Sequence, residues 1–428
     1  MNNRLSFKIY PRELLFSIFL VMLPISLIIE MNVGTGLISY TDEALGIICI
    51  IYTAYFSMKR GIKGNDLLII FLSVILSLST IIGNYISKVL TDWFPIAVDL
   101  LCLLKMYFPF VVYKQVAEYD KNCKILGYLA PVSKLLIISG AIFAFISLFV
   151  DIGMTGAGDL RYGLPQYNFI FVNGSRYGYI VACALLVLMI GDTPKQKMTF
   201  YEILALFSMI LVNKGVVLVV VAIYLLLKFL WRGNREAKFS FKNIIVIVIG
   251  VLAVSGYQID TYLKNLNSPR MILLRYGLKT ANEYFPLGSG FATYGSDMAA
   301  RNYSRLYTQY GFENMYGLTP DNTSFLNDCY LGMVFGQFGY LGTILFIAIM
   351  VTIFVILLRC NFANKNIKAL VLAVYLGIII STVGTAIIKS SIGVFVFAML
   401  GTICGYSYNI NLQKSRENAL SKQESNSK

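Results

Sequence analysis

The chain has 428 residues, of which 57% are hydrophobic and only 14% are charged, and its mean hydropathy is +0.70. Soluble domains are about 45–50% apolar and about 25% charged, so this composition excludes an ordinary soluble protein. It predicts an all-α polytopic membrane protein, because helices satisfy their own backbone hydrogen bonds in lipid. The formal charge of +14 is typical of cytoplasmic Lys and Arg in membrane proteins, and we expect no nucleic-acid partner.

Twelve apolar segments are predicted to cross the bilayer, the first as a retained span and not as a signal peptide. Most are continuous over about 14–20 residues and do not alternate, which excludes a transmembrane β-barrel. The expected limits are 13–30, 44–58, 67–86, 94–112, 135–150, 178–191, 200–212, 215–230, 243–257, 329–358, 369–384 and 391–408.

Orientation follows from the distribution of positive charge between the loops. With the N-terminus inside, the inner segments hold 24 of the 36 Lys and Arg residues and the outer segments hold 11. Both termini are therefore predicted to be cytoplasmic. Two outer segments are long enough to carry a binding or catalytic site, a smaller one at 151–177 and a large polar one at 258–328. Residues 409–428 form a cytoplasmic tail whose polar end is expected to be disordered.

The sequence contains no histidine, which is the commonest general base and metal ligand in proteins. Its seven cysteines include no C-x-x-C pair. We therefore predict neither a metal nor a cofactor. Only Cys329 is placed near the outer face, so no structural disulfide is expected there.

Within the fourth segment, Asp99 and Lys105 are charged residues in an apolar environment, and each is expected to face protein or water. Their spacing turns them about 240° apart on a helix, so we do not expect a direct pair. Lys214 lies in a turn between two short spans, from which its side chain could project into an outer cavity.

The tripeptide Arg-Tyr-Gly occurs three times, beginning at Arg161, Arg176 and Arg275. All three copies fall in the two outer segments. Arginine presents a fork of donors that matches phosphate oxygens, and a tyrosine such as Tyr276 offers an aromatic face with a polar tip. The copies therefore favour a binding site for anions and sugars. The alternative is interfacial, since Tyr and Arg both favour the membrane boundary.

In the large loop, Ser268 and Pro269 predict the start of a helix over 270–282. Arg275 and Lys279 would share one face of that helix. Together with Arg270 they could meet a lipid-linked phosphate at the membrane surface. A plain interfacial support helix is the alternative.

A glycine-rich run at 286–296 predicts a tight loop, and no strand–turn–helix unit surrounds it that would indicate a dinucleotide site. Cations and aromatic residues then alternate at helical spacing, which suits carbohydrate or phosphate binding or, alternatively, ordinary packing of the loop. They are Arg301, Tyr303, Arg305, Tyr307 and Tyr310. Asp328 lies where the loop re-enters the membrane, where partial desolvation raises the pKa of a carboxyl group and suits it to act as a base. An ordinary helix cap is the alternative for Asp328.

Three stretches, in this order, resemble the O-antigen and capsular polysaccharide repeat-unit polymerases (Wzy-type), which are related to the O-antigen ligases. Residues 213–215 resemble the family's Ser-Arg-Gly turn, with the first two residues changed. The run 286–296 resembles its Pro-x-Gly-x-Gly segment, and 327–342 resembles its re-entry motif. The likeness covers residues 180–345. Asp328 stands where the ligases carry a histidine, and Gln337 replaces the usual glutamate, which favours a polymerase over a ligase.

The resemblance implies glycosyl transfer at the outer leaflet of the bacterial cytoplasmic membrane. The donor would be a glycan on undecaprenyl pyrophosphate, and the acceptor a single lipid-linked repeat unit. A flippase and a chain-length regulator are the expected protein partners. Asp328 is the expected base. The expected substrate-binding residues are Arg161, Arg176, Lys214, Arg270, Arg275, Tyr276, Arg301 and Arg305.

Two other functions fit the sequence. A ligase would move finished glycan to another carrier, and a flippase or transporter would also fit twelve spans. Transporters often show inverted repeats, and no convincing two-half repeat is present here.

Overall fold

The computed structural model describes residues 11–33, 36–62, 64–120, 123–161, 163–171, 173–191, 194–232, 239–254, 256, 264–362 and 364–426. Each of the twelve predicted segments corresponds to one helix of this described part. These helices are α1 (Pro11–Val33), α2 (Thr41–Arg60), α3 (Gly64–Ser87), α4 (Trp93–Tyr119), α5 (Lys124–Ile146), α6 (Gly174–Ile190), α7 (Lys195–Leu211), α8 (Gly215–Leu230), α9 (Phe241–Val254), α14 (Tyr330–Arg359), α15 (Lys365–Ser381) and α16 (Ser391–Asn426).

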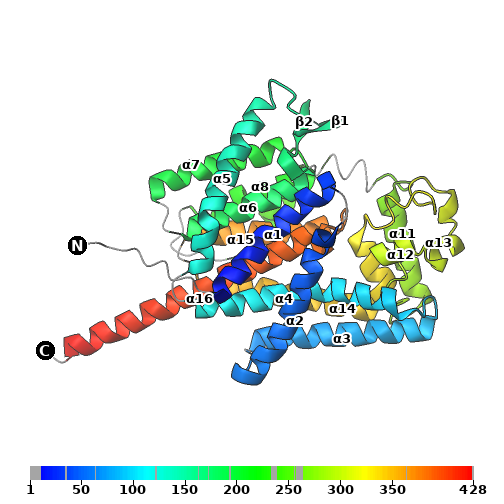
Figure 1. Ribbon diagram of the computed structural model, residues 1–428, viewed down its shortest axis with the longest axis horizontal. Helices are drawn as coiled ribbons and strands as arrows, with labels where there is room; N and C mark the ends of the chain where they lie inside the picture. Colours follow the sequence, from blue (N-terminus) through cyan, green and yellow to red (C-terminus); the bar gives the residue numbers. More distant parts are fainter. Residues whose placement is uncertain are drawn as a thin grey trace.

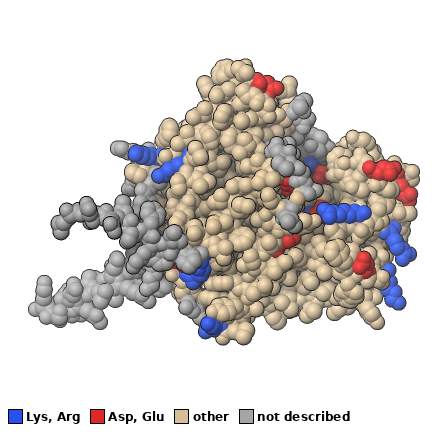
Figure 2. All heavy atoms as spheres, viewed as in Figure 1, with Lys and Arg blue, Asp and Glu red and all other residues tan. Residues whose placement is uncertain are grey.

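Six of the described helices are long and apolar enough to cross a membrane, namely α1, α3, α4, α5, α14 and α16. Helices α6, α8 and α9 are apolar but shorter. The chain is therefore a helical protein with several membrane-spanning candidates. On the face seen in Figure 2, broad surfaces carry no charged side chain, and charged side chains gather at the right-hand edge, over α11–α13 of Figure 1.

Shorter elements fill the two predicted outer segments. Strands β1 (Thr155–Arg161) and β2 (Leu164–Tyr167) pair in an antiparallel hairpin. This hairpin is the exception to the predicted all-α fold. The described part of the large loop, from residue 264, contains three helices, α11 (Pro269–Glu283), α12 (Asp297–Arg301) and α13 (Arg305–Gln309). The described 3-10 turns are η1 (Leu37–Tyr40), η2 (Phe169–Phe171), η4 (Phe312–Asn314) and η5 (Ile387–Lys389).

The centre of the bundle is the pair formed by α4 and α16, which pack along each other. Glycines on α16 permit this close approach, since a Cβ on Gly401 would meet the Phe110 carbonyl oxygen at 2.3 Å and one on Gly405 would meet the Lys114 carbonyl oxygen at 2.2 Å. Small residues let helix backbones approach in this way in membranes, where packing rather than the hydrophobic effect drives association.

Two lysines of α4 inside the bundle are paired with carboxylates. Lys105 of α4 lies 2.6 Å from Asp42 and 2.5 Å from Glu43, so it does not pair with Asp99, as predicted. Lys114, nine residues further along α4, lies 2.8 Å from Asp66. These pairs join α4 to α2 and α3, which is a structural role that the sequence did not reveal.

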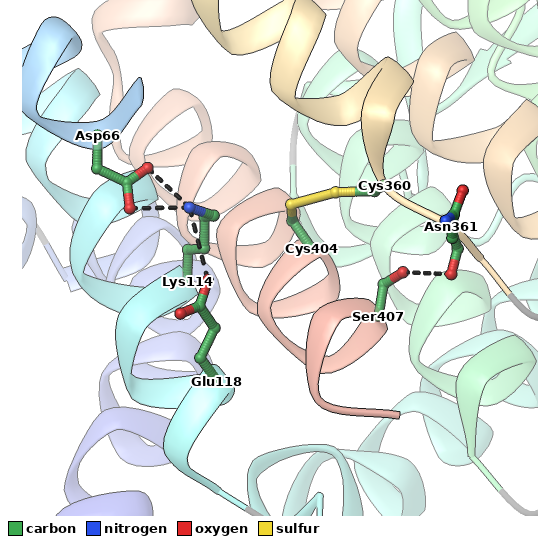
Figure 3. Close-up of a disulfide and its surroundings, with 7 residues drawn as sticks. All are labelled: Asp66, Lys114, Glu118, Cys360, Asn361, Cys404 and Ser407. Atoms are coloured by element: carbon green, nitrogen blue, oxygen red, sulfur yellow. Dashed lines mark hydrogen bonds and ion pairs between the residues drawn. A yellow bond between two sulfur atoms is a disulfide. The ribbon is translucent and has the colours of Figure 1, made fainter. Parts of the chain in front are cut away.

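A disulfide between Cys360 and Cys404 joins the end of α14 to α16, with 6.2 Å between the two Cα atoms. Figure 3 shows it beside the hydrogen bond from Ser407 to the Asn361 carbonyl, 2.7 Å long, which joins the same two segments. The sequence did not predict this pairing, because spacing alone does not identify the partner of a cysteine.

Helix α16 continues through Asn426, so the expectation of a disordered end to the tail is wrong for residues 421–426. This helix leaves the bundle on the side opposite to α11–α13 (Figure 1).

Candidate functional site

The predicted glycine-rich loop 286–296 is bound to the kinked N-terminal part of α14. Backbone N–H groups of Ser289 and Gly290 donate to the carbonyl oxygens of Gly336 and Gln337, at 2.9 and 3.0 Å. Helix α14 has a non-helical residue at Gly339, with φ 62° and ψ −163°. Two of the three motifs named above, 286–296 and 327–342, thus contact each other through their backbones.

Glycine is required at this contact because the two backbones touch. A Cβ on Gly288, whose φ is +75°, would lie 2.3 Å from the Gly339 amide nitrogen. A Cβ on Gly339 would lie 2.2 Å from the Gly288 amide nitrogen. No side chain fits on either residue without moving the loop or the helix.

Two buried polar side chains from the bundle hold the other side of the loop. Asn84 of α3 donates to the Phe291 carbonyl at 2.9 Å and accepts from the Phe291 amide at 2.7 Å. Asp99 of α4 accepts from the Ala292 amide at 2.9 Å and from the Gln337 side chain at 3.0 Å. Hydrogen bonds of this kind compensate a buried carboxylate. Asp99, predicted to face protein or water, thus positions the loop.

A cavity of about 20 Å³ opens where α4, α12, α14 and η5 meet. That space holds one or two water molecules and is too small for a sugar ring. Charged and polar side chains face it from all four elements. Its lining includes Asp99, Ser296, Asp297, Tyr330, Gln337 and Lys389.

The cation of the cavity is Lys389, which the 3-10 turn η5 holds between α15 and α16. Its Nζ atom lies 3.1 Å from an oxygen of Asp297, the first residue of α12. Asn327 also donates to the Asp297 carboxylate. The Lys389 ammonium lowers the pKa of Asp297 to about 2, so Asp297 is ionised at neutral pH.

A second pair of opposite charges lies beside the cavity. Arg270 of α11 is 3.5 Å from an oxygen of Asp328. Burial raises the pKa of Asp328, and the nearby Arg270 and Lys389 oppose that rise. A raised pKa brings a carboxyl group closer to the range useful for a base. The structure thus brings together the predicted base Asp328, one predicted phosphate ligand and the lysine of η5.

Helix α11 begins as predicted, with the Ser268 side chain accepting from the Met271 amide at 3.3 Å. Arg275 is exposed on this helix. Tyr276 packs against Tyr310 and Phe312, with ring centroids 5.0 and 5.1 Å apart. These two predicted ligands do not line the cavity.

The residues from 301 to 310 do not form one helix. Helices α12 and α13 are separate, and Arg301 and Arg305 are both exposed. Tyr307 and Tyr310 belong to an apolar cluster that fills the large loop, which fits the packing alternative. Burial raises the pKa of both tyrosines, so neither acts as a base near neutral pH.

The remaining predicted cations lie at another place in the fold. Arg176 is in the first turn of α6 and half-buried, and Lys214 donates at 3.2 Å to Asn173, the residue that caps α6. Neither lines the cavity. Arg161 ends β1, and its side chain lies outside the described residues.

Lys389 is the site residue that the sequence analysis missed. The available signal was a single lysine between two apolar segments that were predicted to meet at the outer face. In the distribution of positive charge it is only one of the eleven Lys and Arg residues of the outer segments. Nothing in the local sequence indicated that Asp297 would meet it.

A scan against protein-family models finds no match, and a search of curated proteins also finds none.

Proposed function

We propose that the chain is a polysaccharide polymerase that joins lipid-linked oligosaccharide repeat units at the outer leaflet of the bacterial cytoplasmic membrane. In this proposal all twelve helices that correspond to the predicted segments cross the bilayer, both termini are cytoplasmic, and the segments 151–177 and 258–328 face outward. The donor is a growing glycan on undecaprenyl pyrophosphate, and the acceptor is one lipid-linked repeat unit.

One observation carries the proposal. The two glycine-rich segments 286–296 and 327–342 are two of the three stretches that resemble repeat-unit polymerases, and they pack backbone to backbone beside the cavity. The contact supports a common role for the two motifs.

The charges around the cavity suit transfer from a pyrophosphate. An acceptor hydroxyl gives its proton to the Asp328 carboxylate while its oxygen attacks the anomeric carbon of the donor. The bond from that carbon to the pyrophosphate oxygen breaks, and the lipid pyrophosphate leaves with the electron pair. Arg270 and Lys389 are the cations that neutralise the departing charge, which is where electrostatic stabilisation has its largest effect.

Arg176 and Lys214, near the β-hairpin, make a second cationic site. The proposal therefore has two sites for anions. A polymerase of this kind holds two lipid pyrophosphates at once, one on the donor and one on the acceptor. We assign the acceptor to the site near α6, because the predicted base Asp328 lies with the cations of the cavity.

The test is complementation of a strain that lacks the gene, followed by electrophoresis of the surface glycan. Asp328→Asn and Arg270→Ala are expected to reduce long-chain polymer by about a hundredfold, through loss of the general base and of a cation at the leaving group respectively, and to leave single repeat units. Asp321→Asn and Arg359→Ala remove exposed residues of the same types and are expected to leave the ladder unchanged.

The glycan pattern also separates the other functions. Long chains on the wrong carrier would indicate a ligase, and repeat units stranded on the inner leaflet would indicate a flippase. Full-length polymer in both Asp328→Asn and Arg270→Ala cells would end the proposal.

A further inference from the structure

Lys389 is the buried cation of the cavity, with 9% of its side chain exposed. An ammonium group has three hydrogen-bond donors. The described residues offer Nζ no hydrogen bond of good geometry, and its contact with Asp297 at 3.1 Å is an ion pair alone. The side chain is thus held by charge with unused donors at the cavity.

The two partners of this ion pair differ in their freedom to move. Asp297 has 46% of its side chain exposed and begins a helix of only five residues. Its carboxylate can rotate into water at little cost, since exposed ion pairs contribute weakly to stability. Lys389 lies on the turn between two buried helices, and leaving its charge buried without a partner is strongly unfavourable.

We propose that Asp297 closes an anion site on Lys389, and that an oxyanion ligand of the phosphate or diphosphate class opens it by taking the place of the carboxylate. The assignment of a lipid diphosphate as this ligand rests on the proposed function. The exchange itself rests only on the geometry of the pair.

The cavity is small, and its volume of about 20 Å³ holds one or two water molecules. In this proposal the ligand takes the space beside Lys389 that the Asp297 carboxylate leaves. Exchange then keeps the buried ammonium paired throughout, because one anion replaces another. Asp99 is another carboxylate at the cavity. It accepts hydrogen bonds from the Ala292 amide and the Gln337 side chain, and these compensate its charge.

The neighbouring pair is coupled to this exchange. Lys389 is among the charges that act on Asp328, which itself pairs with Arg270 at 3.5 Å. Asn327, the residue before Asp328, donates to Asp297. Departure of Asp297 from Lys389 therefore releases a contact next to the predicted base, so ligand entry and the position of Asp328 change together.

The experiment uses the full chain in lipid nanodiscs and measures binding by calorimetry in a buffer without phosphate or sulfate. The probes are inorganic pyrophosphate and farnesyl pyrophosphate. Asp297→Asn removes the competitor and is expected to bind inorganic pyrophosphate about tenfold more tightly than the unchanged protein. Lys389→Met is expected to weaken binding by about tenfold or more, and Lys389→Arg to retain it.

Matched controls come from the pair of Lys228 and Glu202, which joins α8 to α7. Glu202→Gln and Lys228→Met are expected to leave pyrophosphate binding unchanged. Tighter binding in Asp297→Asn and weaker binding in Lys389→Met would together show that the carboxylate competes with the ligand for Lys389. A merely structural ion pair would give variants that lose thermal stability without tighter binding. Unchanged or weaker binding in Asp297→Asn would overturn the proposal even if Lys389→Met does not fold.

The two probes separate the sources of the anion. Tighter binding of farnesyl pyrophosphate than of inorganic pyrophosphate supports a lipid headgroup, and equal binding supports a free anion at the same site. Opposite effects of the two variants on binding, together with full-length polymer in both Asp328→Asn and Arg270→Ala cells, would retain the exchange and reject the polymerase. Absence of those effects, with loss of polymer in Asp328→Asn cells, would reject the exchange and retain the polymerase.

Discussion

At the scale of single residues, the Asp297–Lys389 pair has a measurable dependence on pH. Lys389 lowers the pKa of Asp297 from 3.8 to about 2. A carboxyl group whose folded-state pKa is depressed stabilises the fold above its unfolded pKa and loses that contribution as pH falls. The contribution is about 1 kcal/mol or less, because the carboxylate is half-exposed.

We therefore expect the unchanged protein to melt at a higher temperature than Asp297→Asn above pH 4, in a buffer without competing anions. The difference should shrink as the pH falls from about 4 towards 2 and Asp297 becomes protonated. Thermal unfolding of both proteins in detergent at a series of pH values measures it. A difference that stays constant down to pH 2 contradicts the assigned pKa.

Individual site residues could be predicted from sequence only where their surroundings are local. Asp328 was identified because it directly precedes an apolar segment, and Arg270 because it follows the capped start of α11. Lys389 was not identified as a ligand, since its partner Asp297 is far away in the chain. The sequence leaves two roles open for Tyr307, ligand binding or packing of the loop. Only its contacts with neighbouring residues show that it belongs to the apolar cluster of the loop.

At the scale of elements, the contact between the glycine loop and α14 makes a specific prediction. Gly339→Ala places a side chain at φ 62° against the Gly288 backbone. We expect a loss of at least about 2 kcal/mol in the free energy of unfolding, since a strained backbone alone costs about 1–3 kcal/mol. Thermal unfolding and the yield of monodisperse protein in detergent measure the effect.

Gly384→Ala is the matched control, because the space around a Cβ there is open within 4 Å and its φ is not positive. It should leave both measurements unchanged. Equal melting temperatures for Gly339→Ala and Gly384→Ala would mean that the loop and the helix do not touch as described.

The helices were predictable because continuous apolar runs separated by charged residues are a strong signal. The hairpin of β1 and β2 was not, since its sequence is rich in glycine and lacks clear alternation. The kink at Gly339 was also missed. Its sequence reads as helix throughout, and the deviation arises from the loop that binds against it.

At the scale of the whole molecule, the proposed orientation places α13 outside and the start of α7 inside. In a background with the partly exposed Cys102 and Cys123 replaced by serine, we expect Gln309→Cys to react in intact cells with a maleimide that does not cross membranes. Lys197→Cys should react only after the cells are permeabilised. Both positions are exposed, so the difference reports sidedness. The reverse pattern would place α11–α13 in the cytosol and remove the basis of the proposed function.

The class of the fold and the order of its apolar helices could be predicted, and six of the described helices meet the length and hydropathy that a span requires. The assembly of the site could not, because α4, α12, α14 and η5 converge from distant parts of the chain. Periodicity and composition describe each segment separately and carry no information about such convergence.

The glycine contact between the loop and α14 has a consequence for recognising related chains. A pair of backbones that touch leaves neither residue free to change alone, and enlarging one cannot be offset by shrinking the other, since both already lack a side chain. Relatives that diverge in their arginines would still be expected to keep glycine at both places. A search profile anchored on that pair, with the intervening length left variable, should therefore find distant members that cation-based patterns overlook.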